Sequence, residues 1–276
     1  MKNNLIKRSV TALFFVVIIL TSIFVNQYTF AGIFMIITTI SLIEFYQLTE
    51  KGGFKPQKRY GIIMGTVMFI LSFLIANSFV PVFYFLLCIP LIIIMLIAEL
   101  YRIKEHHFRC MAFTIFGVVY VAVPFSLMNF LLINPLTGNS YSYVFILSFF
   151  LIIWLNDTGA YIFGSNFGKN KLFPRISPKK TWEGTFGGVV TALLVGVAIS
   201  FYFDELSLIQ WIIFALITSV FGTYGDLVES MLKRRSGVKD SGHILPGHGG
   251  MLDRFDSALF AAPMVFIFLK IVEILN

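Results

Sequence analysis

The sequence predicts an all-α, polytopic integral membrane protein with about nine transmembrane helices. Hydrophobic residues make up 58% of its 276 residues and charged residues only 13%, whereas about a quarter of the residues in a soluble globular chain are charged. The mean hydropathy is +0.86. The apolar residues also gather into runs long enough to cross about 30 Å of hydrocarbon, which takes roughly 20 helical residues.

The apolar runs follow one another with short polar breaks, and we interpret each run as one helix. In chain order they cover residues 9–25, 29–48, 61–78, 80–99, 111–133, 143–163, 185–203, 208–228 and 257–275. The first run follows a basic start, as in a signal peptide, but no small-residue cleavage site comes after it, so we expect it to be retained. Asn77 and Ser78 form the weakest break, which Pro81 supports. The polar motifs all lie in residues 136–276, and residues 1–135 are mainly transmembrane helices.

The lysine and arginine residues indicate how these helices are oriented. With nine spans and a cytoplasmic N-terminus, all but Lys270 of the 21 lysine and arginine residues fall on the cytoplasmic side, as the positive-inside rule requires. We therefore predict a multi-pass protein of the cell membrane. Its two long polar loops, about 164–184 and 229–256, then face the cytoplasm. No segment outside the membrane is large enough to fold as an independent unit, so chemistry is expected at the boundary between membrane and cytoplasm.

Charge and isolated polar residues exclude some other functions. The net charge of +7 does not predict nucleic-acid binding, because no basic surface helix or stacking module accompanies it. Cys88 and Cys110 lie in or beside apolar runs and fit buried hydrophobic residues better than a disulfide. Glu44 and Glu99 lie near the inner ends of their spans, and we interpret them as interfacial carboxylates rather than ligands.

Residues 230–256 carry a density of charge found nowhere else in the chain. The cationic side chains are Lys233, Arg234, Arg235, Lys239 and Arg254. Helix-breaking residues in the middle leave backbone N–H groups free to point at a ligand; they are Pro246, Gly247, Gly249 and Gly250. Cations and free amides together offset the charge of phosphate groups.

Two pairs of carboxylates flank this stretch. Asp226 and Glu229 are three residues apart and share a helix face, and Asp253 and Asp256 have the same spacing. Carboxylate oxygens are the ligands of hard divalent cations such as Mg²⁺, so we predict metal ligands at all four positions. Two alternatives remain: Asp226 and Glu229 also fit pairing with Lys233, and Asp253 and Asp256 also fit helix N-caps.

Two further motifs precede this stretch. Asp157 interrupts an apolar run, where a charge costs about 2.5–3.5 kcal/mol on insertion scales, so we expect it to line a polar cavity rather than only to bond a neighbouring helix. The second motif supplies hydroxyls, two lysines and a helix N-terminus, which together suit phosphate. Its residues are Ser177, Lys179, Lys180 and Thr181. A pair of topogenic lysines followed by an N-cap is the alternative interpretation.

The run S-x-L-K-R-x4-K-D-x-G-x2-L-P-x-H-G-G-M-x-D-R-F-D resembles the signature of the phosphatidate cytidylyltransferase (CDP-diacylglycerol synthase) family. Its fixed positions here include Ser230, Lys233, Arg234, Lys239, Asp240, His248, Gly249, Gly250, Asp253, Arg254 and Asp256. The segments N-D-T-G-A-Y at 156–161 and S-P-K-K-T-W-E-G at 177–184 are similar to the family as well. The resemblance covers residues 156–256 by motif and the rest of the chain by hydropathy.

The resemblance implies an enzyme that transfers a cytidylyl group from CTP to phosphatidic acid, giving CDP-diacylglycerol and pyrophosphate, with its catalytic region in residues 136–276. It implies that Asp226 and Asp253 hold Mg²⁺, with Glu229 and Asp256 as additional ligands; a second divalent or a monovalent cation stays an alternative. The catalytic residues expected are Asp226, Asp253, Lys239 and Asp256. The substrate-binding residues expected are Asp157, Ser177, Lys179, Lys180, Thr181, Lys233, Arg234, Arg235, His248, Gly249, Gly250 and Arg254.

The expected partners are CTP, phosphatidic acid and the lipid bilayer, with no nucleic acid; a homodimer stays an alternative to a single chain. Arg234 or Arg235 is expected to hold the lipid phosphate. Two other functions remain. A CTP-dependent kinase acting on a polyprenol would use the same site but produce CDP. An ion-coupled transporter would need charges spread through the centres of its spans, whereas here they gather at one side.

Overall fold

The computed structural model describes residues 2–102, 106–134, 140–242, 244 and 249–275. Eight of its helices are long and apolar enough to cross a bilayer. Helix α1 (Lys2–Val25) corresponds to the first predicted span, with an apolar stretch at Leu13–Val25. The all-α, multi-pass membrane fold is therefore confirmed.

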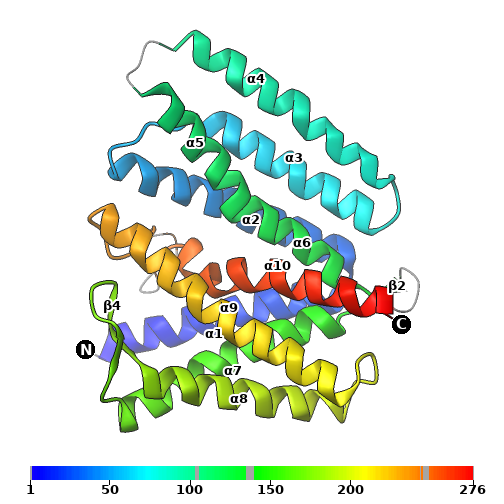
Figure 1. Cartoon of the computed structure of the whole chain (residues 1–276), viewed down its shortest axis with the longest axis vertical. Coiled ribbons are helices and arrows are strands. Elements are labelled where there is room, and N and C mark those ends of the chain that lie inside the picture. The colour runs from blue at the N-terminus through cyan, green and yellow to red at the C-terminus, as the bar shows by residue number, and fades with distance from the viewer. Residues whose placement is uncertain (1, 103–105, 135–139, 243, 245–248, 276) are drawn as a thin grey trace.

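The helices run back and forth between two ends of the molecule (Figure 1). After α1 they are α2 (Gln27–Lys51), α3 (Lys58–Ala76), α4 (Cys88–Leu100), α5 (His107–Gly117), α6 (Val123–Leu131), α7 (Val144–Phe167), α8 (Trp182–Ser200), α9 (Leu208–Arg235) and α10 (Leu252–Leu275). A 3₁₀ segment, Val82–Leu87, leads into α4, and a π-helical segment, Val118–Ala122, joins α5 to α6. The π-segment lies just before Pro124, whose missing N–H would interrupt an α-helix.

Two short antiparallel hairpins interrupt the helices. β1 (Ile133–Asn134) pairs with β2 (Ser140–Tyr141), and β3 (Lys171–Phe173) pairs with β4 (Ser177–Thr181). The second hairpin lies in the loop predicted at 164–184, where the sequence analysis expected no strands. It brings β4 directly to the N-terminus of α8.

The other long loop is shorter than predicted. Helix α9 continues to Arg235 and α10 begins at Leu252, so the loop is 236–251 rather than 229–256. The last turn of α9 is basic, and cations at a helix C-terminus stabilise it through the helix dipole. As a result Asp253 and Asp256 lie in the first turns of a helix rather than in the predicted loop.

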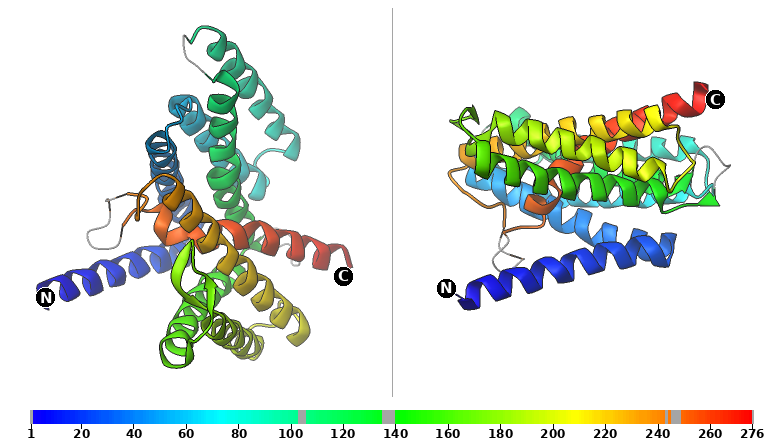
Figure 2. Two further views of the ribbon diagram at one scale, coloured as in Figure 1. Left: turned by 60° about the vertical axis from the view of Figure 1, so that its left-hand side comes forward. Right: turned by 90° about the horizontal axis from the view of Figure 1, so that it is seen from below.

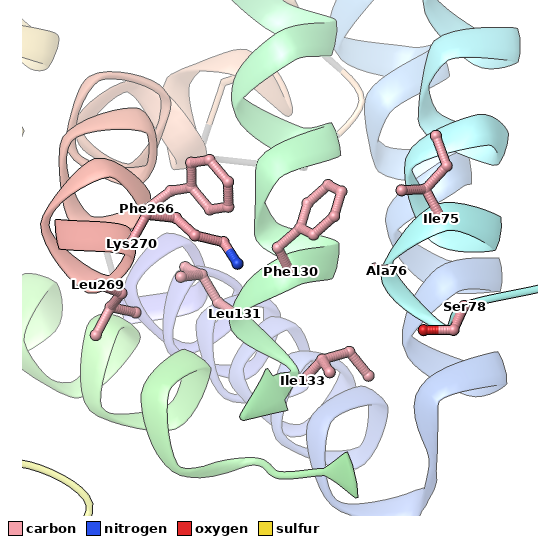
Figure 3. A pocket seen from close by; sticks show the side chains of 9 residues that line it. All are labelled: Ile75, Ala76, Ser78, Phe130, Leu131, Ile133, Phe266, Leu269 and Lys270. Atoms are coloured by element: carbon pink, nitrogen blue, oxygen red, sulfur yellow. The ribbon is translucent and has the colours of Figure 1, made fainter. Parts of the chain in front are cut away.

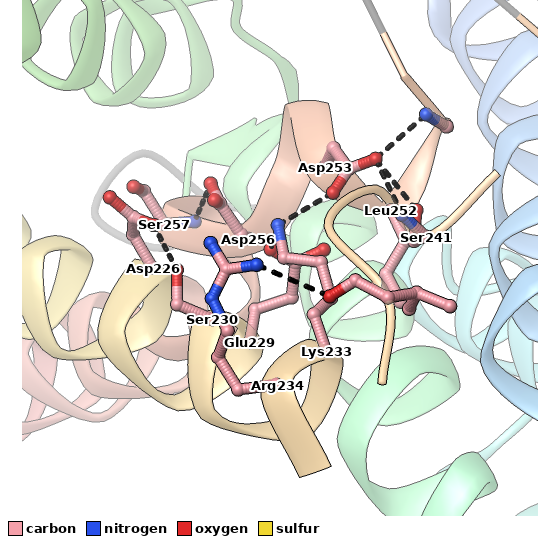
Figure 4. A network of polar contacts seen from close by, with 12 residues as sticks. Asp226, Glu229, Ser230, Lys233, Arg234, Ser241, Leu252, Asp253, Asp256 and Ser257 are labelled. Atoms are coloured by element: carbon pink, nitrogen blue, oxygen red, sulfur yellow. Dashed lines mark hydrogen bonds and ion pairs between the residues drawn. The ribbon is translucent and has the colours of Figure 1, made fainter. Parts of the chain in front are cut away.

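The aromatic core holds α10 in place beside the charged residues. The ring of Phe255 lies 5.1 Å from that of Phe125, 5.8 Å from Phe34 and 5.6 Å from Phe15 of α1. Figure 2 shows α1 along the edge of the bundle. Because Phe255 is buried in this core, its neighbour Asp256 is directed towards α9 and away from the apolar centre (Figure 4).

Candidate active site

Three carboxylates from two helices converge at the end of the bundle where α9 finishes and α10 begins. Asp226 and Glu229 lie on one face of α9, and Asp256 lies on the facing side of α10 (Figure 4). One oxygen of each carboxylate lies within 4.8 Å of the others. We call these three residues the carboxylate cluster.

Glycine residues allow α9 and α10 to approach closely at this point. A Cβ atom added at Gly225 would lie 3.1 Å from the Cβ of Phe260 and 3.2 Å from the Cα of Ser257. Small residues at a crossing let helix backbones pack closely inside a membrane. The close crossing explains why carboxylates 27 to 30 positions apart in the chain come together.

Two lysines pair with the acidic residues. Lys180 of β4 pairs with Asp226, and Lys233 of α9 pairs with Glu229 and with Asp253, at 2.6 Å from Asp253 Oδ1. Glu229 is fully buried, and within the described part of the chain its Oε1 has no hydrogen-bond partner. A buried, unsatisfied carboxylate oxygen is costly. The all-oxygen donor set and this unpartnered oxygen fit a hard divalent cation.

Asp253 has different surroundings from the cluster. Its Oδ1 accepts from Lys233, and its Oδ2 accepts from Ser241 N at 2.9 Å, Ser241 Oγ at 3.0 Å and Gly250 N at 2.7 Å. Both oxygens are therefore engaged by donors of the protein. The expectation that Asp253 binds the metal stays a prediction. The N-cap alternative is wrong for Asp253, because α10 begins at Leu252 and the donor Gly250 N precedes Asp253, whereas an N-cap accepts from N–H groups that follow it.

Among the described residues, one cavity beside the cluster has a volume of about 400 Å³ and lies among α7, β4, α8 and α9. We call it the lysine cavity, because Lys179 and Lys180 line it together with Asp157, Thr181 and Asp226. Thr181 Oγ1 accepts a hydrogen bond from Gly184 N at 3.2 Å, so this residue is the N-cap of α8. The helix N-terminus therefore lies at the wall of the cavity, where its dipole favours anions.

The second cavity, of about 270 Å³, lies among α1, α7, α9 and α10. We call it the arginine cavity. Its charged lining residues are Asp157, Asp226, Asp253, Arg254 and Asp256, and its apolar wall includes Phe15, Val16, Ile153 and Trp154. Asp157 and Asp226 line both cavities. Asp157 and Asp226 thus lie between a cavity that contains two lysines and a cavity with an apolar wall.

Asp157 lines a polar cavity, as predicted, and its neighbours hold it there. Asn156 is buried; it accepts from Ser219 Oγ at 2.6 Å and donates to Asp157 Oδ1 at 3.4 Å. Helices α7 and α8 pack closely beside it, since a Cβ added at Gly184 of α8 would lie 3.0 Å from the Cα of Gly164.

Several predicted site residues do not line either cavity in the described part of the chain. Ser177 begins β4 and pairs with Phe173. Arg234, Arg235 and Lys239 are exposed at the end of α9 and just after it, and Arg234 donates to Val238 O at 3.3 Å. Gly249 has a φ of +83° and lies next to Asp253. His248 lies outside the described residues.

Glu44 of α2, interpreted from the sequence as an interfacial carboxylate, is buried inside the protein. Its side chain is 1% exposed, and its carboxylate accepts from Met251 N and Leu252 N at the start of α10. Glu99 is also buried, at 3%, and is bonded to Arg102 and His107. The interpretation of both residues as interfacial carboxylates is wrong. A carboxylate inside an apolar run was the available signal, because such a group needs a buried partner.

A third cavity lies at the opposite end of the bundle, near the ends of α3, α6 and α10 (Figure 3). Its lining is mainly apolar, with Phe130, Leu131 and Phe266, and its charged lining residue is Lys270. Lys270 pairs with Glu273 at 2.6 Å. None of the described residues that line this cavity is a carboxylate, so it does not resemble a metal site.

Comparison with known proteins identifies the family to which the chain belongs. The profile of the cytidylyltransferase family matches residues 6–272. A protein named phosphatidate cytidylyltransferase from Staphylococcus haemolyticus (strain JCSC1435) is 48% identical over 159 residues, and one of the same name from Staphylococcus aureus (strain COL) is 49% identical over 160 residues. Each alignment covers 57% of this chain and 58% of the relative, so the match spans little more than half of the relatives' length. Because the family profile extends over nearly all of its residues, the chain belongs to the cytidylyltransferase family.

Proposed function

We propose that the chain is a phosphatidate cytidylyltransferase, which makes CDP-diacylglycerol and pyrophosphate from CTP and phosphatidic acid. The observation that carries this proposal is the position of the carboxylate cluster between the lysine cavity and the arginine cavity. Such a site suits two anionic substrates, one water-soluble and one with acyl chains. The names of the relatives support the same activity.

The lining of each cavity supports a different substrate there. Lys179, Lys180 and the N-terminus of α8 would neutralise the triphosphate of CTP in the lysine cavity. Arg254 would hold the lipid phosphate in the arginine cavity, where a guanidinium can form a bidentate contact. The apolar side chains of Phe15 and Trp154 in the same cavity suit the start of an acyl chain. In this proposal Arg254 binds the lipid phosphate, which the sequence had led us to expect of Arg234 or Arg235.

Asp226, Glu229 and Asp256 would hold Mg²⁺. When bound, the ion would withdraw charge from the α-phosphate and the departing pyrophosphate. An oxygen of the lipid phosphate attacks the α-phosphorus, the bond from that phosphorus to the oxygen bridging to the β-phosphorus breaks, and pyrophosphate leaves with the electron pair. The nucleophile is already an anion, so no side chain has to remove a proton. Lys179 and Lys180 reduce the repulsion between the two polyanions.

We also propose that the site faces the cytoplasm from the cell membrane. The loops between α2 and α3, α7 and α8, and α9 and α10 lie at the same end of the bundle as the carboxylate cluster (Figure 1). Most of the chain's lysine and arginine residues lie at this end, and basic residues are retained on the cytoplasmic side. CTP is available on that side.

The test uses the purified full chain in lipid nanodiscs with phosphatidic acid, Mg²⁺ and CTP labelled at the α-phosphate. We expect labelled CDP-diacylglycerol and an equal amount of pyrophosphate, and both should disappear when EDTA removes Mg²⁺. A polyprenol in place of phosphatidic acid tests the kinase alternative, which would give CDP and a phosphorylated lipid. Formation of neither nucleotide product would contradict the proposed function and leave the transporter as the alternative.

A further inference from the structure

Glu44 connects the N-terminal helices to the loop that precedes α10. Its Oε1 accepts from Met251 N at 3.0 Å, and its Oε2 accepts from Leu252 N at 2.8 Å and lies 3.2 Å from Ser241 Oγ, whose single hydrogen is shared between Glu44 and Asp253. The carboxylate is buried in the middle of these donors. A full charge inside a transmembrane bundle is costly, and here each of its oxygens is directed at the α9–α10 loop or the first turn of α10.

The contacts continue from Glu44 to the carboxylate cluster. Ser241 Oγ lies within hydrogen-bond distance of both Glu44 Oε2 and Asp253 Oδ2, at 3.2 and 3.0 Å. Asp253 Oδ1 in turn holds Lys233, which pairs with Glu229 of the cluster (Figure 4). A continuous path of polar contacts therefore runs from α2 through the loop to α9.

Two glycines of the loop pack directly against Glu44. A Cβ added at Gly242 would lie 2.7 Å from the Glu44 carboxyl carbon, and one added at Gly250 would lie at the same distance from it. Contacts this short would displace the carboxylate. The two glycines thus leave the space that the Glu44 carboxylate occupies beside Ser241 and the start of α10.

We infer that Glu44 is a positioning residue, which sets the place of Asp253 and Lys233 and through them the metal affinity of the carboxylate cluster. The inference deepens the proposed function and rests on it where turnover is concerned. A purely structural carboxylate would affect the stability of the bundle alone. A positioning residue should also change the requirement for the divalent ion.

The first experiment compares Glu44→Gln with the wild type and with Glu99→Gln in nanodiscs. Glu99 is a suitable control because it is equally buried but bonds to Gln57, Arg102 and His107, away from the loop. The glutamine at position 44 would direct an NH₂ group at one of the backbone donors. Mn²⁺ binding is measured by electron paramagnetic resonance, and the Mg²⁺ dependence of turnover is measured in parallel.

We expect Glu44→Gln to weaken Mn²⁺ binding by about tenfold and to raise the Mg²⁺ midpoint similarly, the lower end of the range for residues that support metal ligands. Glu99→Gln should keep the wild-type midpoint even if its melting temperature falls. An unchanged metal affinity in folded Glu44→Gln would overturn the inference. If the wild type binds Mn²⁺ but makes no CDP-diacylglycerol, the proposed function fails while the role of Glu44 is still tested by binding.

Two further variants test the inference even if the Glu44→Gln protein does not fold. Gly242→Ala keeps the carboxylate but pushes it out of place, so it should weaken Mn²⁺ binding as well. Ser241→Ala removes the hydroxyl between Glu44 and Asp253, and combining it with Glu44→Gln should add little to either single effect, because residues of one network are not additive. Wild-type binding in Gly242→Ala, or full additivity in the double variant, would contradict the path through Ser241.

Discussion

Asp226 and Asp253 carry the same side chain at positions that the sequence does not distinguish, but they have different partners. Asp226 is half-buried at the boundary of two cavities and is bonded to Lys180 and Ser230. Asp253 accepts from Lys233, Ser241 and Gly250 and uses both of its oxygens. The first is placed to meet a ligand, and the second holds the surrounding chain together.

Replacing each aspartate by asparagine should therefore have different effects. Asp226→Asn removes a charge from the cluster, so turnover should fall by at least about 100-fold, since a metal's charge stabilisation is worth several kcal/mol and each 1.36 kcal/mol is a factor of ten. The melting temperature should stay close to that of the wild type. Initial rates and thermal unfolding in the same detergent measure both quantities.

Asp253→Asn should lower the melting temperature as well as the rate. Hydrogen bonds to a charged group contribute about 1.5–3 kcal/mol each, and the amide would direct two hydrogens at sites now occupied by donors. Thermal unfolding of the two variants side by side is the test. Equal melting temperatures for Asp226→Asn and Asp253→Asn would contradict the distinction between them.

The crossing of α9 and α10 is the element on which the cluster depends. Gly225 allows the two backbones to touch beside Asp256, and Phe255 anchors the opposite face of α10 among Phe15, Phe34 and Phe125. The carboxylates come from helices of different spans. Their spacing is therefore controlled by the distance between the helix backbones as well as by side-chain rotamers.

Gly225→Ala should separate these helices and reduce both stability and turnover. Its added methyl group would meet Phe260 Cβ and Ser257 Cα at 3.1 and 3.2 Å. Gly32→Ala on α2 is the matched control, because a Cβ there has nothing within 4 Å. Alanine is favoured over glycine in a helix by about 1 kcal/mol, so this control should unfold at the same temperature as the wild type or a higher one. Thermal unfolding and initial rates of both variants provide the comparison; a Gly225→Ala protein as active as Gly32→Ala would contradict the role of the crossing.

At the scale of the whole molecule, charge is distributed between the two ends of the bundle. The carboxylate cluster and both cavities beside it lie at the end where most lysines and arginines are found, and the mainly apolar cavity near Lys270 lies at the other (Figures 1 and 3). Positive charge near a membrane is retained in the cytoplasm. The proposed orientation follows from this distribution.

Labelling of single cysteines in intact cells should report that orientation. In a Cys88→Ala, Cys110→Ala background, cysteine at Asp204 should react with a membrane-impermeant maleimide. Cysteine at Lys51 should react only after the cells are opened. Both native residues are exposed, so access to the reagent rather than burial decides the result. The reverse pattern would place the site on the outer side and contradict the proposed function.

The transmembrane spans and the motif residues were predictable because hydropathy and spacing are local properties of the chain. Neighbouring residues alone were enough to predict the nine apolar runs, the break at Asn77 and Ser78, and the polar cavity at Asp157. The β3–β4 hairpin was missed, as was the extension of α9 to Arg235, because charged residues and turn formers do not distinguish a helix end or a hairpin from a loop.

Sequence alone determined that this chain crosses a membrane repeatedly and carries most of its acidic and basic residues near one side. Tertiary structure decided which of them meet. Glu44 lies 197 positions from Ser241 along the chain, and Phe15 shares a cavity with Asp256. The cost of burying Glu44 is offset only by donors that the folded loop supplies. No pattern in the sequence indicates which distant segment supplies these hydrogen-bond donors, because the choice of segment depends on how the helices pack.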